Sequence, residues 1–126
     1  MAYRILLVED TGDIRTLMRV VLESYGYSVI EATDGVEAVE KAGSELPDAI
    51  IIDMSLPLLD GSKATRLIRE NPALRHVPII ACTAYNRWEW RGKSLVAGCD
   101  AFITKPVDFD QLHATLSALL SRRKAS

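Results

Sequence analysis

Along the chain, short apolar runs alternate with longer segments in which apolar residues recur every three or four positions. Short apolar runs predict five β-strands, and residues with helical periodicity follow each of them. The predicted strands cover residues 4–8, 27–32, 49–52, 77–82 and 101–104. The run Ala49-Ile50-Ile51-Ile52 is apolar without interruption, which is typical of a strand that is covered on both faces.

The segments after the strands carry helix signals at their faces and at their ends. The apolar face of the first helix comprises Ile14, Leu17, Met18, Val21, Leu22 and Tyr25. Gly26 follows it, where a left-handed cap is expected. Asp34 and Glu37 have the spacing of a capping box and begin the second helix. Three further helices are predicted over residues 62–70, about 88–97 and from 109 onward.

Strands that alternate with helices predict an α/β fold. Each right-handed crossover places successive strands parallel, so we expect one parallel sheet between two layers of helices. In such sheets, ligands bind beyond the carboxyl ends of the strands. We expect one domain over residues 1–122 and a short basic tail over 123–126, with no output domain.

Composition narrows the class of protein. With 126 residues the chain is long enough for one core, and 15 basic against 17 acidic side chains give a net charge of −2. This balance argues against direct binding to nucleic acid or to an anionic membrane. No signal peptide or membrane-spanning run is visible, so we expect a cytoplasmic protein. Cys82 and Cys99 are expected to be buried free thiols, and isolated His76 and His113 argue against zinc.

Polar side chains follow four of the predicted strands. Glu9 and Asp10 come after the first strand, Asp53 after the third, Thr83 after the fourth and Lys105 after the fifth. Three carboxylates at one edge of a sheet raise one another's pKa unless a cation holds them ionised. Carboxylates with open coordination positions suit Mg²⁺. Each residue alone has an ordinary structural explanation, but their convergence favours a site.

The chemistry of this set points to phosphoryl transfer. Asp53 ends the most buried strand and is the candidate carboxylate nucleophile. Mg²⁺ is expected to be held by Asp10, by Asp53 and by a backbone carbonyl just after it. Lys105 supplies a second cation and Thr83 a hydroxyl donor for the phosphoryl oxygens.

Four separated motifs resemble the receiver domain of bacterial two-component response regulators. They are Glu9-Asp10, Asp53-Met54-Ser55-Leu56-Pro57-Leu58-Leu59-Asp60-Gly61, Thr83-Ala84 and Lys105-Pro106. The resemblance covers nearly the whole chain. It implies a flavodoxin-like (βα)5 three-layer sandwich whose five parallel strands have the order 2-1-3-4-5.

The resemblance also implies a role for each matching residue. Asp53 is the phosphoacceptor for a sensor histidine kinase or a histidine phosphotransfer protein, and Thr83 and Lys105 contact the phosphoryl group. The magnesium site comprises Glu9 acting through water, Asp10, Asp53 and the backbone carbonyl of Ser55. The domain is then a signalling switch rather than an enzyme, because it catalyses only its own phosphorylation and dephosphorylation.

Phe102 falls at the aromatic switch position, which is often Tyr in this family. Phosphorylation adds roughly −1.5 to −2 charges and draws Thr83 toward the phosphoryl group. The space that Thr83 vacates can take the ring of Phe102, and the surface of the fourth helix, fifth strand and fifth helix repacks. We expect a downstream target protein to bind this surface.

The segment Arg87-Trp88-Glu89-Trp90-Arg91 is the least generic in the chain. Two residues that are two apart cannot both face the core from one helix. At least one of Trp88 and Trp90 is therefore partly exposed and, with Arg91, offers an interface anchor. A tryptophan that covers its own helix without binding a partner explains the pattern equally well.

Other functions remain open from the sequence. Within the family, the chain is either a stand-alone regulator or a receiver taken from a hybrid kinase or a DNA-binding regulator. A magnesium-dependent phosphatase with an aspartate nucleophile is the alternative from another class, but it needs a second acid where this chain has Ser55. A dinucleotide enzyme needs a glycine-rich turn where Glu9 and Asp10 stand.

Overall fold

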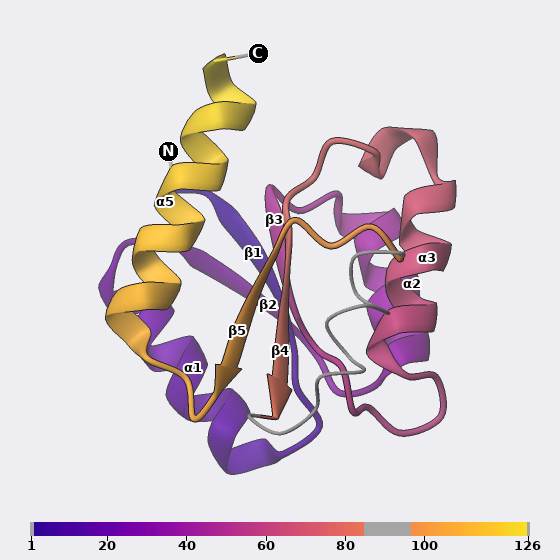
Figure 1. Cartoon of the computed structure of the whole chain (residues 1–126), viewed down its shortest axis with the longest axis horizontal. Coiled ribbons are helices and arrows are strands. Elements are labelled where there is room, and N and C mark those ends of the chain that lie inside the picture. The colour runs from indigo at the N-terminus through magenta and orange to yellow at the C-terminus, as the bar shows by residue number, and fades with distance from the viewer. Residues whose placement is uncertain (1, 85–96, 126) are drawn as a thin grey trace.

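One parallel sheet of five strands forms the centre of the protein (Figure 1). The computed structural model describes residues 2–84 and 97–125. The strands are β1 (Arg4–Val8), β2 (Ser28–Ala32), β3 (Ala49–Asp53), β4 (Ile79–Ala84) and β5 (Ala101–Lys105). Their order is β2-β1-β3-β4-β5 and all neighbours pair in parallel, which confirms the predicted topology.

Helices cover both faces of this sheet, as Figure 1 shows. In the described residues they are α1 (Gly12–Ser24), α2 (Gly35–Glu45), α3 (Gly61–Glu70), α5 (Phe109–Ala125) and a 3₁₀ turn over Pro72–Leu74. The helices α1 and α5 pack on one face, and α2 and α3 on the other. The three-layer sandwich is therefore confirmed. Trp88, Trp90 and Arg91, with most of the helix expected around them, lie outside the described residues.

Two separate cores result from the alternation of side chains along the strands. Ile50 and Ile52 belong to the core under α2 and α3, whereas Ala49 and Ile51 belong to the core under α1 and α5. All four residues are at most 1% exposed. The uninterrupted apolar run of β3 thus serves both layers, as the sequence predicted.

Local signals set most of the helix ends. Gly26 has φ +93° after α1, and the side chain of Asp34 accepts the N–H of Glu37 at the start of α2. Glu37 reaches back to the N–H of Thr33 rather than to that of Asp34, so the capping box is shifted by one residue. The helix α5 continues to Ala125, through the basic residues at the end of the chain.

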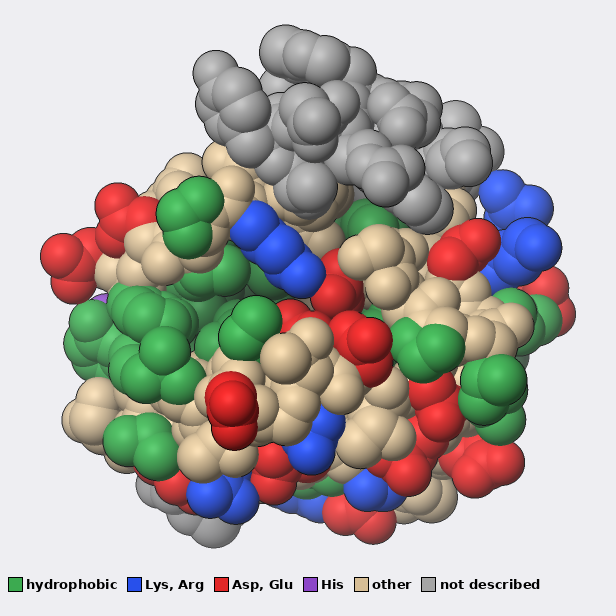
Figure 2. Space-filling model, turned by 90° about the horizontal axis from the view of Figure 1, so that it is seen from below, with side chains coloured by type: hydrophobic (Ala, Val, Ile, Leu, Met, Phe, Trp, Pro, Cys, Tyr) green, Lys and Arg blue, Asp and Glu red, His purple; other side chains and the backbone are tan. Residues whose placement is uncertain are grey.

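The helix α1 buries less of its apolar face than its sequence pattern suggested. Met18 and Leu22 are buried, but Ile14 is 43% and Leu17 is 53% exposed. Figure 2 views the protein from below Figure 1, at the edge where β4 and β5 end, and shows a hydrophobic hollow beside acidic side chains.

None of the described helices is long and apolar enough to cross a membrane.

Candidate functional site

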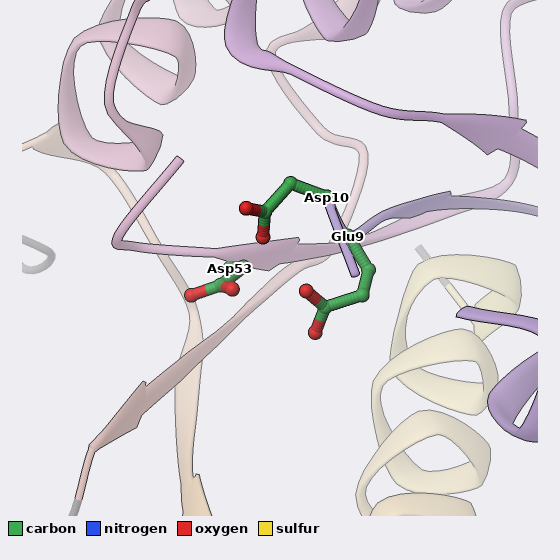
Figure 3. Close-up of side chains that lie close together, drawn as sticks. All are labelled: Glu9, Asp10 and Asp53. Atoms are coloured by element: carbon green, nitrogen blue, oxygen red, sulfur yellow. The ribbon is translucent and has the colours of Figure 1, made fainter. Parts of the chain in front are cut away.

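The carboxyl edge of the sheet brings the three predicted acids together. Glu9 and Asp10 follow β1 and Asp53 ends β3, and carboxylate oxygens of the three lie within 4.8 Å of one another (Figure 3). Glu9 and Asp53 are each only 3% exposed, whereas Asp10 is exposed to solvent. The cluster therefore has two buried members and one that is open to water.

Hydrogen bonds fix both oxygens of the Asp53 carboxylate. Oδ1 accepts the N–H of Ser55 at 3.0 Å and its hydroxyl at 3.1 Å. Oδ2 accepts from Nζ of Lys105 at 2.8 Å. The chain packs so closely here that a Cβ on Gly61 would lie 2.3 Å from the carbonyl oxygen of Asp53. Glycine at this position therefore lets α3 begin against the end of β3.

Lys105 reaches the acids across the end of β4. Its Nζ also lies 3.6 Å from Oε1 of Glu9. Burial by itself lowers the pKa of Lys105, but the hydrogen bond and the charge of Asp53, together with Glu9, outweigh burial and raise it. Lys105 therefore stays cationic and joins Asp53 to Glu9.

Thr83 and Phe102 lie on one face of the sheet near this edge. Thr83 is 2% exposed and stands two residues after Ala81, which pairs with Phe102. Side chains two apart on a strand share a face, and Phe102 packs against the core that contains Ala81. The structure thus brings the predicted switch pair to the same side of the sheet.

The surroundings of Glu9 disfavour the ionised form of its carboxyl group. Burial raises the pKa of Glu9 from its ordinary value of 4.5 to about 7, and the charge of Asp53 adds to this effect. The N–H of Thr11 and the charge of Lys105 act in the opposite direction. Lys105 alone therefore does not offset the cost of ionising Glu9 at this edge of the sheet. A hard divalent cation such as Mg²⁺ fits this set of oxygen ligands.

A cavity of about 320 Å³ opens beside the acids, between α1 and the turn after β5. Glu9, Asp53 and Lys105 lie at one side of it, and the remaining lining is apolar. The apolar residues are Leu7, Val8, Ile14, Leu17, Met18, Ile51, Cys82, Pro106, Val107 and Phe109. Burial, with the charge of Asp53, raises the pKa of Cys82 to about 12, so this free thiol stays neutral. The cavity could not be predicted from the sequence, because it is formed by segments far apart in the chain.

Comparison with known proteins decides the family. Residues 5–117 match the response regulator receiver domain. The chain belongs to this family.

Other receiver domains share both its sequence and its structure. The response regulator MprA of Mycobacterium tuberculosis (strain H37Rv) is 39% identical over 124 residues, which are 98% of this chain and 53% of MprA. The chain thus spans about half the length of the curated relatives it matches. The receiver domain of signal transduction histidine kinase from Syntrophus aciditrophicus superposes with a TM-score of 0.92 at 34% identity, over 99% of this chain and 95% of that one.

A further solved receiver domain holds a metal ion. It belongs to sensor histidine kinase PA1611 of Pseudomonas aeruginosa PAO1 and has magnesium coordinated in its active-site cleft. Its TM-score is 0.90 at 39% identity, over 96% of this chain and 99% of that one.

The raised pKa of Glu9 predicts how the stability of the metal-free domain changes with pH. Between about 4.5 and 7 the folded chain binds the Glu9 proton more tightly than the unfolded chain does. The free energy of unfolding therefore falls as pH rises through this range, by about 1–3 kcal/mol from this residue. Glu9→Gln cannot ionise, so we expect it to remove this part of the decline.

Urea denaturation across this pH range, with a chelator present, measures the difference. Glu40→Gln replaces an exposed acid on α2 and serves as the control, with the same pH dependence as the wild type. Parallel curves for Glu9→Gln and the wild type would contradict the burial and charge repulsion assigned to Glu9.

Proposed function

We propose that Asp53 accepts a phosphoryl group from a phosphohistidine and that the domain acts as a phosphorylation-controlled switch. The observation that carries this proposal is the Asp53 carboxylate itself. It is held at the carboxyl edge of the sheet by Ser55 and lies 2.8 Å from the Lys105 ammonium, beside two further acids. Membership of the receiver family supports the same role.

In the proposed reaction, a carboxylate oxygen of Asp53 attacks phosphorus and forms an acyl phosphate. The phosphorus–nitrogen bond breaks, its electron pair stays on the imidazole nitrogen, and solvent supplies the proton that neutralises it. Lys105 balances negative charge on the phosphoryl oxygens, and the hydroxyl of Thr83 donates to one of them. Ser55 keeps the carboxylate oriented through Oδ1.

A magnesium ion supplies further charge neutralisation when it is bound. Glu9 through water, Asp10, Asp53 and the backbone carbonyl of Ser55 are the groups that would hold it. Glu9 and Asp53 are buried and fixed, so they offer a preformed part of the site, and exposed Asp10 completes it from the solvent side.

The phosphatase alternative loses support at Ser55. An acid at this position would act as the general acid and base of such an enzyme. Here the Ser55 hydroxyl instead donates to Asp53 at 3.1 Å, which orients the nucleophile but offers no titrating group. The domain is therefore better suited to hold an acyl phosphate than to turn over phosphomonoesters.

Covalent labelling tests the phosphoacceptor. Incubation with acetyl phosphate and Mg²⁺ is expected to add one phosphoryl mass to the wild type and none to Asp53→Asn. Asp60→Asn is the matched control, since Asp60 caps α3 through the N–H of Lys63 and asparagine caps equally well. An adduct on Asp53→Asn, or none on the wild type, would refute the proposal.

We propose that Thr83 and Phe102 transmit the phosphorylation to the face formed by β5, α5 and the fourth helix expected from the sequence, most of which lies outside the described residues. Movement of buried Thr83 toward the phosphoryl group frees space on the face of the sheet where Phe102 packs. A downstream target protein would read this change.

Thr83→Ala is expected to remain phosphorylatable. It is expected to lose most of the movement of the Phe102 ring that follows phosphorylation, because no hydroxyl is drawn toward the phosphoryl group. Ring signals of Phe102, followed by NMR before and after phosphorylation, give the measurement. Thr83→Ser keeps the hydroxyl and is expected to respond like the wild type. A full response in phosphorylated Thr83→Ala would show that Thr83 does not couple the two sites.

The phosphodonor protein is proposed to approach over α1. Ile14 and Leu17 are exposed at the mouth of the apolar cavity that leads to Asp53. Leu58, in the loop after β3, is 84% exposed and has φ +67°, a conformation that favours glycine. An apolar helix surface on a histidine kinase or phosphotransfer protein would cover these side chains and place its phosphohistidine at the acids.

Leu17→Glu is expected to reduce the rate of transfer from a phosphorylated phosphotransfer domain by about tenfold, because it places a charge in an apolar contact. Labelling by acetyl phosphate needs no docking and is expected to be unchanged. Leu46→Glu is the control: Leu46 has nearly the same exposure, 52%, but lies before β3, at the opposite edge of the sheet. Equal transfer rates for Leu17→Glu and the wild type would place docking elsewhere.

The proposed chemistry does not depend on the larger protein in which the domain works. Relatives include a response regulator and the receiver domain of a sensor histidine kinase, both at 39% identity. The contexts that the sequence leaves open, a stand-alone regulator, a DNA-binding regulator and a hybrid kinase, would all use the same receiver chemistry.

A further inference from the structure

Arg15 on α1 links the backbone of the acidic turn to a neighbouring strand. Its Nη1 donates to the main-chain oxygen of Glu9 at 2.9 Å, and its Nε donates to Oε1 of Glu31 on β2 at 3.1 Å. The side chain is only 20% exposed. One guanidinium therefore bridges two elements and touches the peptide that joins Glu9 to Asp10.

Glu31 is held from its other side as well. Its Oε2 accepts from Nη1 of Arg19 at 3.1 Å, while Oε1 is taken by Arg15. The ammonium of Lys41 donates to the main-chain oxygen of Glu31. With both carboxylate oxygens bound to guanidinium groups, Glu31 holds Arg15 in one orientation.

Hydrogen bonds fix the backbone on both sides of Glu9, through the N–H that precedes its side chain and the carbonyl that follows it. The N–H of Glu9 donates to the carbonyl of Ala32 at 3.1 Å, and Arg15 binds the Glu9 carbonyl. Asp10 follows directly and is exposed, so side-chain packing does less to fix it than it does for Glu9 or Asp53. The direction in which Asp10 points depends on how this peptide is held.

We propose that Arg15, oriented by Glu31, is a positioning residue for the cation site. It holds the Glu9–Asp10 peptide so that the Asp10 carboxylate faces Asp53. This inference rests on the proposed function, because it assumes that the acids bind Mg²⁺. Groups that orient metal ligands from outside the coordination sphere commonly change metal affinity by about 10–100-fold.

The sign of the effect separates positioning from simple electrostatics. Arg15 carries a positive charge near a site that binds a cation, so its Coulomb repulsion alone weakens Mg²⁺ binding. If charge were its main contribution, removing it would tighten binding. If positioning dominates, removing it loosens binding despite the relief of repulsion.

The test is a titration of the metal-free full chain with Mg²⁺, followed by the NMR amide signals of Asp10 and Asp53. Arg15→Met is expected to bind Mg²⁺ about tenfold more weakly than the wild type. Arg19→Met is the matched control: it removes an arginine that also binds Glu31 but does not touch Glu9. It is expected to change the affinity by less than about threefold, since Arg15 still binds Glu31.

Glu31→Gln tests the same link from its other end and covers the case in which Arg15→Met does not fold. It leaves Arg15 charged but weakens its anchor, so we expect weaker binding, and combining it with Arg15→Met adds little. Unchanged or tighter Mg²⁺ binding by Arg15→Met overturns the inference. If Arg15→Met does not fold, unchanged Mg²⁺ binding by Glu31→Gln overturns it instead. Lack of Mg²⁺ binding by the wild type overturns the proposed metal site and this inference together, whereas wild-type binding with unaffected variants overturns this inference alone.

Discussion

The gathering of three carboxylates at one edge of the sheet, two of them buried, is the constraint on which the rest of the site depends. It arises from the fold, because parallel strands with buried apolar runs end side by side and carry their following residues to a common edge. Glu9 and Asp53 are almost fully buried, so water screens their charges poorly. Lys105 pairs with both carboxylates, yet burial and the charge of Asp53 still raise the pKa of Glu9 to about 7. The site is therefore organised to take up further positive charge.

The same gathering of acids explains why the site is suited to switching. In the proposed function, a phosphoryl group adds negative charge beside these acids, and contacts with Lys105 and Thr83 would gain stability only once that charge has arrived. Thr83 is buried in β4 on the face that Phe102 shares, and its movement has to be accommodated by repacking rather than by solvent. In the proposed switch, charge at the edge is converted into a change of packing on this face of the sheet.

The sequence predicted the strand order, the helices of the described residues and the acidic trio well, because these follow from periodicity and from residues at the ends of strands. Asp34 and Gly26 mark helix ends through local geometry, and the structure confirms both. The exposure of Ile14 and Leu17 was not predictable, since periodicity shows which side chains share a helix face but not how far a neighbouring element covers it. The bridge from Arg15 to Glu31 and Glu9 also escaped the sequence, because it joins residues of three elements whose side-chain directions only the fold determines.

The most direct test of this account is the melting temperature of the domain with and without Mg²⁺ at a pH of about 8, with KCl matching the ionic strength. A ligand that binds only the folded state raises its melting temperature. We expect Mg²⁺ to raise the melting temperature of the wild type and of Asp13→Asn, which replaces an exposed acid on α1, and to raise that of Asp10→Asn less. A wild-type melting temperature that is the same in Mg²⁺ and in KCl would contradict it.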